Sequence, residues 1–316
     1  MKPSTAKNVA YNLCASKQAE RRILIDFLKC ANEAGVTISD CRYVGMGGTQ
    51  FYDFHLLHRF LGVKRMVSLE RDDDMFKRPV FNCPYCFIKV MNNTVAEFIE
   101  LDRDRTRTIY WIDYDDAISP EITTDINALG GRSKPSEFVF VTVYAEPPGA
   151  LRDKNSEARL DYFIENLGEY SSGLVREDME NYLFPSTVHR ILVAAFTHAF
   201  STRRDGKFVP WLQIQYSDTK QMITVGGCFC GANAENDIST RVKRDLPFLT
   251  SDTLPYHIKH LNLTERERAL FDIAVTMKGA KSKQISTLET LGFKERDFRA
   301  YKELIRFLPR YYESII

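Results

Sequence analysis

The chain has 316 residues, 44% of them hydrophobic, with 43 basic and 42 acidic residues and a formal net charge of +1. This length suits one large α/β domain with extensions or two modest domains, and the hydrophobic content is ordinary for a soluble globular protein. The near-zero net charge argues against a global attraction to nucleic acid or to anionic membranes, and no apolar run approaches the roughly 20 residues that span a bilayer.

The first half of the chain predicts helices alternating with short buried strands. A helix is expected over residues 17–34, where apolar side chains recur at helical spacing until Gly35. The expected strands that follow are 41–45, 64–70, 87–91, 108–112 and 137–144, with helices over 51–61, 72–80 and 95–101. Short apolar strands separated by helical patterns are typical of a parallel sheet with helices on both faces.

The pattern changes after residue 145. Residues 146–183 are polar and irregular with one expected helix, and a strongly apolar helix follows over 186–200. Strands 211–216 and 221–225 are joined by only four residues, which predicts an antiparallel hairpin. Beyond residue 263 only helices are expected, over 264–277, 282–291 and 295–307.

These elements predict an α/β fold with a doubly wound, mostly parallel, seven-stranded sheet closed by an antiparallel hairpin. The domain boundaries follow from the same pattern. We expect an N-terminal helical lid over residues 1–40, a core over 41–232 with a substrate-shaping insertion at 146–183, and a C-terminal helical appendage over 233–316.

The most informative motif is RYVGMGG at residues 42–48, followed by a helix and by a second strand that ends at Glu70. Glycines allow the backbone to approach a nucleotide-like ligand closely, and a carboxylate after the second strand can accept both ribose hydroxyls. The alternative for the glycines is an ordinary tight turn, and for Glu70 a solvated strand end.

The order of these elements resembles the class I S-adenosylmethionine-dependent methyltransferases over roughly residues 41–230. The segments RYVGMGGTQFYDFHLLHRFLGVKRMVSLERD, NCPYCFIKV and IYWIDYDD look more closely like a poorly characterised group of bacterial O-methyltransferases named from their fold. This resemblance implies S-adenosylmethionine as the cofactor and a methyl acceptor that the sequence does not identify.

The resemblance also implies roles for individual positions. Gly45, Gly47 and Gly48 would face the methionine part of the cofactor, and Glu70 would bind the ribose. Asn92 or Asn93, just past the third strand, would read the adenine amino group, although both are also common turn residues. Asp113, at the end of the fourth strand, would lie beside the transferred methyl group.

The residues after the fourth strand depart from the pattern of the amino-base methylases. The sequence here is Asp113-Tyr114-Asp115-Asp116, without the prolines of their Asp/Asn-Pro-Pro-aromatic motif. Tyr114 could still stack on a planar substrate, and Asp113 and Asp115 are candidate bases for an oxygen nucleophile. A divalent metal is not expected, because the later Asp-Asn pair of the catechol-type enzymes is missing.

The segment before the core is a candidate lid. Residues 11–18 could fold over the cofactor, so that Lys17 or Arg21 meets a carboxylate of the cofactor or of the substrate. A plain helix start is the alternative. The amino end, MKPSTAKN, has no signal-peptide core, so we expect a cytoplasmic protein.

Two further features leave alternatives open. Cys83, Cys86, Cys228 and Cys230 could supply four thiolates to zinc, or be free cysteines of the core. The C-terminal helices have a mild basic excess and many aromatic residues, which favours a protein partner or a homodimer surface over nucleic-acid contact.

The functional prediction is methyl transfer from S-adenosylmethionine to an oxygen or nitrogen. The rival hypothesis is a catalytically silent methyltransferase-fold scaffold or sensor subunit of a bacterial complex. A nicotinamide-dependent dehydrogenase is disfavoured, because Phe51 stands where the last glycine of G-x-G-x-x-G is due.

Overall fold

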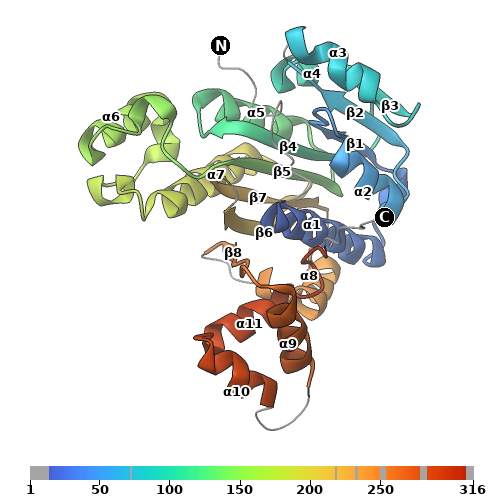
Figure 1. The fold of residues 1–316 in the computed structure, drawn as a ribbon. Helices are drawn as coiled ribbons and strands as arrows, with labels where there is room; N and C mark the ends of the chain where they lie inside the picture. The colour runs from blue at the N-terminus through green and yellow to red at the C-terminus, as the bar shows by residue number, and fades with distance from the viewer. Residues whose placement is uncertain are drawn as a thin grey trace.

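The computed structural model describes residues 14–71, 73–217, 219–231, 234–249, 254–277 and 283–310. Residues 11–13 of the expected lid therefore lie outside the described residues. The chain forms an eight-stranded sheet with the order β3-β2-β1-β4-β5-β7-β6-β8 (Figure 1). Among the described helices, none has both the length and the hydropathy needed to cross a bilayer.

Five strands run parallel and the hairpin closes the sheet, as the sequence predicted. The strands are β1 Arg42–Gly45, β2 Arg65–Leu69, β3 Ile88–Met91, β4 Thr108–Ala117, β5 Glu137–Tyr144, β6 Lys207–Ser217, β7 Gln221–Cys230 and β8 Tyr256–Ile258. Strand β7 is antiparallel to both β5 and β6, and the short strand β8, which the sequence did not predict, adds in parallel to β6.

The helices are α1 Ala15–Glu33, α2 Tyr52–Leu61, α3 Asp73–Asn82, α4 Val95–Leu101, α5 Pro120–Arg132, α6 Ser156–Leu167, α7 Phe184–Phe200, α8 Ala234–Asp245, α9 Glu265–Thr276, α10 Lys283–Thr290 and α11 Glu295–Leu304. Helix α5, between β4 and β5, is not among the helices that the sequence predicts. Its Pro120 starts the first turn, and Ile122, Ile126 and Leu129 form its buried face.

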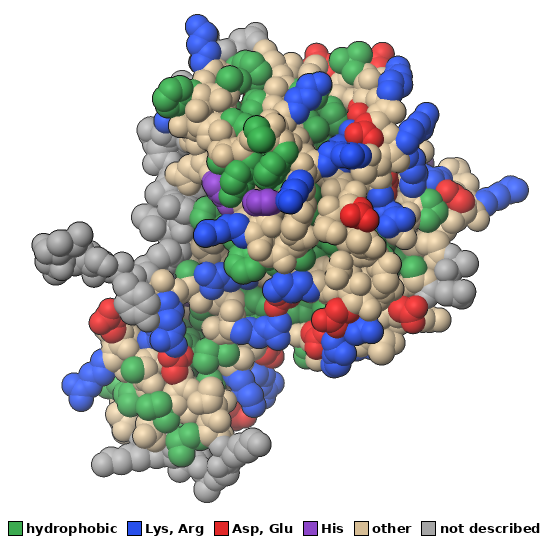
Figure 2. Space-filling model, turned by 90° about the vertical axis from the view of Figure 1, so that its right-hand side faces the viewer, with side chains coloured by type: hydrophobic (Ala, Val, Ile, Leu, Met, Phe, Trp, Pro, Cys, Tyr) green, Lys and Arg blue, Asp and Glu red, His purple; other side chains and the backbone are tan. Residues whose placement is uncertain are grey.

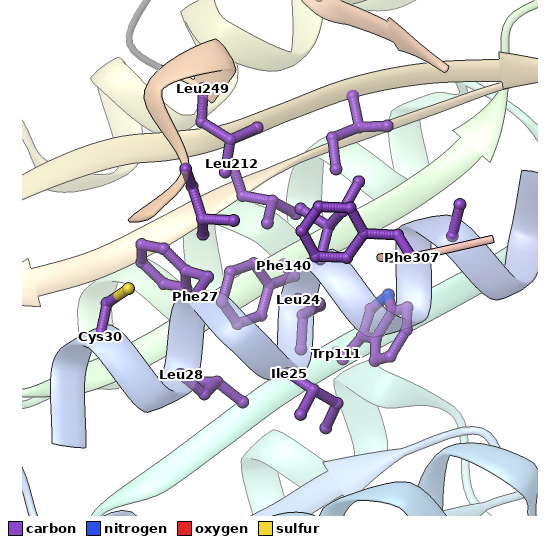
Figure 3. Close-up of a cluster of buried hydrophobic side chains, with 14 of the residues drawn as sticks. Leu24, Ile25, Phe27, Leu28, Cys30, Trp111, Phe140, Leu212, Leu249 and Phe307 are labelled. Carbon is purple, nitrogen blue, oxygen red and sulfur yellow. The ribbon is translucent and has the colours of Figure 1, made fainter. Parts of the chain in front are cut away.

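Alternating side chains of the central strands divide the core into two layers. Trp111 and Phe140 belong to the layer under α1 and α2, whereas Tyr110 and Ile112 belong to the layer under α4, α5 and α7. Successive residues of a strand point to opposite faces, which produces this division. In the first layer, the ring of Phe27 from α1 lies 5.9 Å from that of Phe140 (Figure 3).

The C-terminal helices share the layer under α1. Figure 1 shows α8 to α11 below the sheet, on the side of α1. Phe307 packs in the same cluster as Leu24 and Ile25 (Figure 3). The guanidinium of Arg22 also donates to the carbonyl oxygens of Phe307 and Leu308, at 3.2 and 3.0 Å. The appendage is therefore joined to the sheet through α1, in addition to the direct pairing of its strand β8 with β6.

Candidate functional site

The turn after β1 requires glycine at each of the three predicted positions. A Cβ on Gly45 would lie 2.9 Å from the carbonyl oxygen of Trp111, and one on Gly47 would lie 2.7 Å from the Ser68 hydroxyl oxygen. Gly48 has a φ of +54°, in the left-handed region that glycine adopts without strain. A Cβ there would meet nothing within 4 Å, so the turn leaves open space beside Gly48.

The carboxylate of Glu70 is held directly by this turn. The Gly48 amide donates to Glu70 Oε1 at 2.9 Å, and the Gly47 amide donates to Ser68 Oγ at 3.0 Å. Ser68 in turn donates to the same Oε1 at 3.1 Å. Burial raises the pKa of Glu70, and these hydrogen bonds partly oppose the rise. The glycine turn and the acid after β2 thus form one network before any ligand is bound.

A second network surrounds Asp113 on β4. Lys17, near the start of α1, places its ammonium 2.6 Å from Asp113 Oδ2 and 2.9 Å from Glu20 Oε2. The same ammonium donates to the hydroxyl of Tyr216 on β6 at 3.0 Å. The Lys17 side chain is 4% exposed and that of Asp113 25%, so Asp113 is the member that reaches solvent.

The electrostatics of this second network keep the lysine charged. Burial alone would lower the pKa of Lys17, but Asp113 and Glu20 together hold it well above its usual value. Burial raises the pKa of Glu20, against the attraction of Lys17. Hydrogen bonds from Thr224 and Thr142 complete the surroundings of the Glu20 carboxylate.

A buried ion pair joins α1 to α2 beside these networks. Arg21 Nε lies 2.5 Å from Asp53 Oδ1, and the guanidinium lies 4.8 Å from the ring centre of Tyr52. Lys17 and Arg21 were expected to meet a carboxylate of the cofactor or substrate. In the structure both meet carboxylates of the protein itself.

Two of the predicted catalytic residues lie apart from this cluster. Tyr114 follows Asp113 and so points to the opposite face, where its hydroxyl donates to Asp125 Oδ2 on α5 at 2.6 Å. Burial and the neighbouring Asp125 carboxylate raise the pKa of Tyr114 well above its usual value. Asp115 is exposed at the same strand end and contacts the Tyr144 hydroxyl.

Asn92 and Asn93 lie in the turn between β3 and α4, Asn92 exposed and Asn93 half-buried. They therefore follow the strand beside β2, at the edge of the sheet where Glu70 also lies. Asn93 is also a hydrogen-bond partner of the Glu97 carboxylate in the first turn of α4.

The structure does not assemble the four cysteines into a zinc site. Among the residues that the structure describes, no three His, Cys, Asp or Glu side chains could hold a metal ion. Cys228 and Cys230 are buried in β7, whereas Cys83 and Cys86 precede β3. Strands β3 and β7 are five positions apart in the sheet, roughly 24 Å at about 4.8 Å per strand.

Sequence reasoning missed Glu20, Tyr216 and Ser68. Ser68 and Glu70 are two residues apart, so strand alternation places them on the same side and could have linked them. Glu20 is one helical turn from Lys17, which is also a detectable spacing. Tyr216 is 199 residues from Lys17, and no local pattern connects the two.

The fold and the position of the glycine turn define a class of protein. A parallel sheet with the order β3-β2-β1-β4-β5, an antiparallel β7 inserted before β6, and a glycine turn facing an acid after β2 are those of the Rossmann-like methyltransferases. A family model described as "Putative O-methyltransferase" matches residues 9–316, and the chain belongs to this family. The activity named in that description favours a transferase over a silent scaffold.

Several solved structures are similar to the chain. The N-methyltransferase NodS from Bradyrhizobium japonicum, in complex with S-adenosyl-L-homocysteine, is 10% identical with a TM-score of 0.38, covering 67% of this chain and 87% of that chain. A putative O-methyltransferase from Klebsiella pneumoniae is 13% identical with a TM-score of 0.41, covering 71% and 85%. A search of curated proteins finds no match.

Proposed function

We propose that this chain transfers a methyl group from S-adenosylmethionine to an oxygen or nitrogen of an acceptor. The observation that carries the proposal is the network in which the Gly47 and Gly48 amides bind Ser68 and Glu70. In open parallel sheets, ligands bind outside the carboxyl ends of the strands, where this network lies. The open space beside Gly48 fits the approach of a ligand to the turn.

Each part of S-adenosylmethionine can be matched to residues at this edge by the hydrogen bonds that it would make. Gly45, Gly47 and Gly48 would border its methionine part. Glu70 would accept the ribose hydroxyls through Oε2, because the turn and Ser68 already occupy Oε1. Asn92 or Asn93, after β3, would accept from or donate to the adenine.

Asp113 is the candidate for the reacting centre. The cofactor supplies an electrophilic methyl group to a lone pair of the acceptor. Lys17 holds Oδ2 of Asp113 at 2.6 Å, which leaves Oδ1 to orient the acceptor and take its proton. The buried Lys17 network also excludes water from one side of this centre.

Titration calorimetry with S-adenosylmethionine, S-adenosylhomocysteine and NAD tests this proposal. We expect micromolar binding of the first two and none of NAD. Glu70→Ala should weaken S-adenosylhomocysteine binding about tenfold or more, equivalent to roughly 1.4 kcal/mol, because it removes the ribose acceptor. Glu165→Ala, on an exposed carboxylate of α6, is the matched control and should bind as the wild type does.

The proposal fails if the folded wild-type protein binds neither methionine derivative. If it binds both, an acceptor screen follows, with S-adenosylhomocysteine formation as the readout. Asp113→Asn should then reduce turnover more than it weakens cofactor binding, because the variant keeps the shape of the side chain but loses the basic carboxylate.

A further inference from the structure

An arginine-rich pocket lies at the opposite edge of the sheet, where β1, β4 and β5 begin. Its cavity volume is about 370 Å³. We call it the amino-edge pocket, and the charged residues that line it are Asp102, Arg103, Asp104, Arg105, Arg132, Lys134 and Glu137. The proposed cofactor site lies at the carboxyl ends of these strands, so the two sites are distinct.

The carboxylates of the amino-edge pocket are already engaged by the protein. The Asp102 carboxylate accepts hydrogen bonds from both terminal nitrogens of Arg42, at 2.8 and 2.6 Å. It also accepts one from Nη2 of Arg132 at 2.6 Å. Glu137 is buried and accepts the backbone amides of Thr108 and Lys134, at 3.1 and 2.9 Å. Asp102 and Glu137 hold the loops together, whereas the side chain of the third acid, Asp104, is 36% exposed.

Three of the arginines at this edge, in contrast, are exposed on the loop before β4. Arg103, Arg105 and Arg107 alternate along the loop before β4 and are all exposed. The ammonium of Lys134 donates to the carbonyl oxygen of Arg105 at 2.6 Å, and Arg65 donates to the Thr106 hydroxyl at 2.6 Å. The loop that carries the three arginines is therefore fixed at two points by neighbouring elements.

The cations of this edge outnumber its carboxylates. Four cations and three carboxylates line the pocket: Arg103, Arg105, Arg132 and Lys134 against Asp102, Asp104 and Glu137. Around it, Arg42, Arg65 and Arg107 add three cations, and Asp40 and Glu100 add two carboxylates. The chain as a whole has a net charge of only +1. A concentrated patch of one sign attracts ligands of the opposite sign even when the net charge is small.

We propose that the amino-edge pocket binds the phosphodiester backbone of a nucleic acid. Guanidinium groups bind phosphate oxygens through paired, charge-assisted hydrogen bonds. The cations continue from the pocket to Arg107 and Arg65, which suits an extended polyanion better than a single phosphate. Ile99 is the one hydrophobic residue of the lining, so the pocket offers little apolar surface to a protein partner.

This proposal goes beyond methyl transfer and does not rest on it. Strand β4 connects the two edges, from Thr108 beside the pocket to Asp113 at the proposed reacting centre. Five residues of strand span roughly 17 Å. A nucleic acid held at the amino edge would therefore be anchored away from the reacting centre.

Fluorescence anisotropy of the full chain without cofactor tests the proposal. The probes are a labelled single-stranded RNA and a labelled DNA duplex, each titrated over a range of NaCl concentrations. The triple variant R103Q/R105Q/R107Q should bind at least one probe about tenfold or more weakly at low salt, and the slope of log affinity against log salt should fall by about 2–3.

The control variant K154Q/R176Q/R266Q removes the same charge from exposed positions elsewhere. It should bind nearly as the wild type does, and an equal loss in both variants would overturn the proposal. Absence of wild-type binding to both probes, or equal binding to phosphatidylserine vesicles, would also overturn it. So would saturable binding of inorganic phosphate without binding of either probe, since the pocket would then serve a free phosphate.

Thermal melting and S-adenosylhomocysteine titration of the triple variant keep the outcomes separable. If the triple variant melts early, the single variant Arg105→Gln replaces it, with a loss of two- to threefold expected. If the triple variant loses nucleic-acid binding but binds S-adenosylhomocysteine as the wild type does, the amino-edge pocket is a nucleic-acid site separate from the cofactor site. Cofactor binding that fails in the wild type leaves the nucleic-acid result standing.

Discussion

The buried Lys17 ammonium shows how one side chain joins the helix that starts the described chain to the sheet. It lies within ion-pair distance of both Asp113 and Glu20 and donates to Tyr216. A buried ion pair adds little net stability compared with apolar packing, but removing one partner leaves the others uncompensated.

We therefore expect Lys17→Met to destabilise the protein by about 3–5 kcal/mol, because Glu20 and Asp113 would lose their shared counter-charge. Lys29→Met is the matched control on the same helix, where a partly exposed lysine pairs with Asp26 at 2.9 Å. It should change the free energy of unfolding by less than about 1 kcal/mol. Urea unfolding at pH 7 measures both, and equal losses would contradict the role given to Lys17.

The raised pKa of Glu70 makes a second prediction at this scale. A carboxyl whose pKa is higher in the folded state binds its proton more tightly there, so its contribution to stability is full below the unfolded value of about 4.3 and is lost as the pH rises through the raised pKa. Glutamine stays neutral at every pH, so Glu70→Gln avoids the stability that the wild type loses when the buried carboxyl ionises. The variant should therefore be more stable than the wild type at pH 7. The two proteins should converge below pH 4. Unfolding curves between pH 4 and 8 measure the difference.

The position of the glycine turn and of Glu70 was predictable from the sequence, because each is fixed by its place at the end of a strand, and their roles toward a cofactor stay predictions. The separation of Asp113 and Tyr114 was also predictable in principle, since adjacent strand residues face opposite sides. The partners of Lys17 were not, because Tyr216 comes from a distant hairpin. Side-chain networks between remote segments depend on packing that no local pattern specifies.

Among the elements, β7 shows that glycines need not mark the end of a strand. The strand was expected to end at Val225, yet it continues through Gly226 and Gly227 to Cys230. Glycines usually weaken strands, but a Cβ on Gly226 would lie 2.5 Å from the backbone of Phe140. They permit close packing of neighbouring strands here. Strand β8 has only three residues, too few for a periodic pattern.

The glycine turn gives a prediction at the scale of elements, because it sets how α2 leaves β1. Gly47→Ala should destabilise the protein by about 1–3 kcal/mol, since its Cβ would meet the Phe51 ring and the Ser68 hydroxyl. Gly131→Ala in α5 is the control, where a Cβ meets nothing within 4 Å, and it should be neutral or stabilising by up to about 1 kcal/mol. Chemical unfolding measures both, and a harmless Gly47→Ala would contradict the tight turn.

At the scale of the whole molecule, the small net charge conceals a segregation that the fold creates. Strands and loops distant in sequence bring their first residues to one edge, where exposed arginines gather, while Glu70 and Asp113 lie at the other, with Asp113 paired to Lys17. Lys and Arg side chains also predominate over Asp and Glu on the face drawn in Figure 2. Composition could not reveal this arrangement, because it depends on the order of strands.

The packing of the C-terminal appendage against the core predicts that it does not unfold as an independent unit. Phe307 is 2% exposed and lies in one hydrophobic cluster with α1 and the sheet, so we expect the appendage and core to unfold together. Phe307→Ala should cost about 3–5 kcal/mol and lower a single thermal transition. Both tryptophans of the chain, Trp111 and Trp211, lie in this cluster, and their fluorescence reports on the core.

Phe81→Ala is the control for this change, because the Phe81 side chain is 89% exposed and its loss should alter stability by about 0.5 kcal/mol or less. If α1 couples the unfolding of the appendage to that of the core, calorimetry and tryptophan fluorescence should give the same melting temperature for Phe307→Ala. An early calorimetric transition with unshifted fluorescence would show instead that the appendage unfolds by itself. The Arg22 contacts to the Phe307 and Leu308 carbonyls would then be a hinge between two separately stable parts.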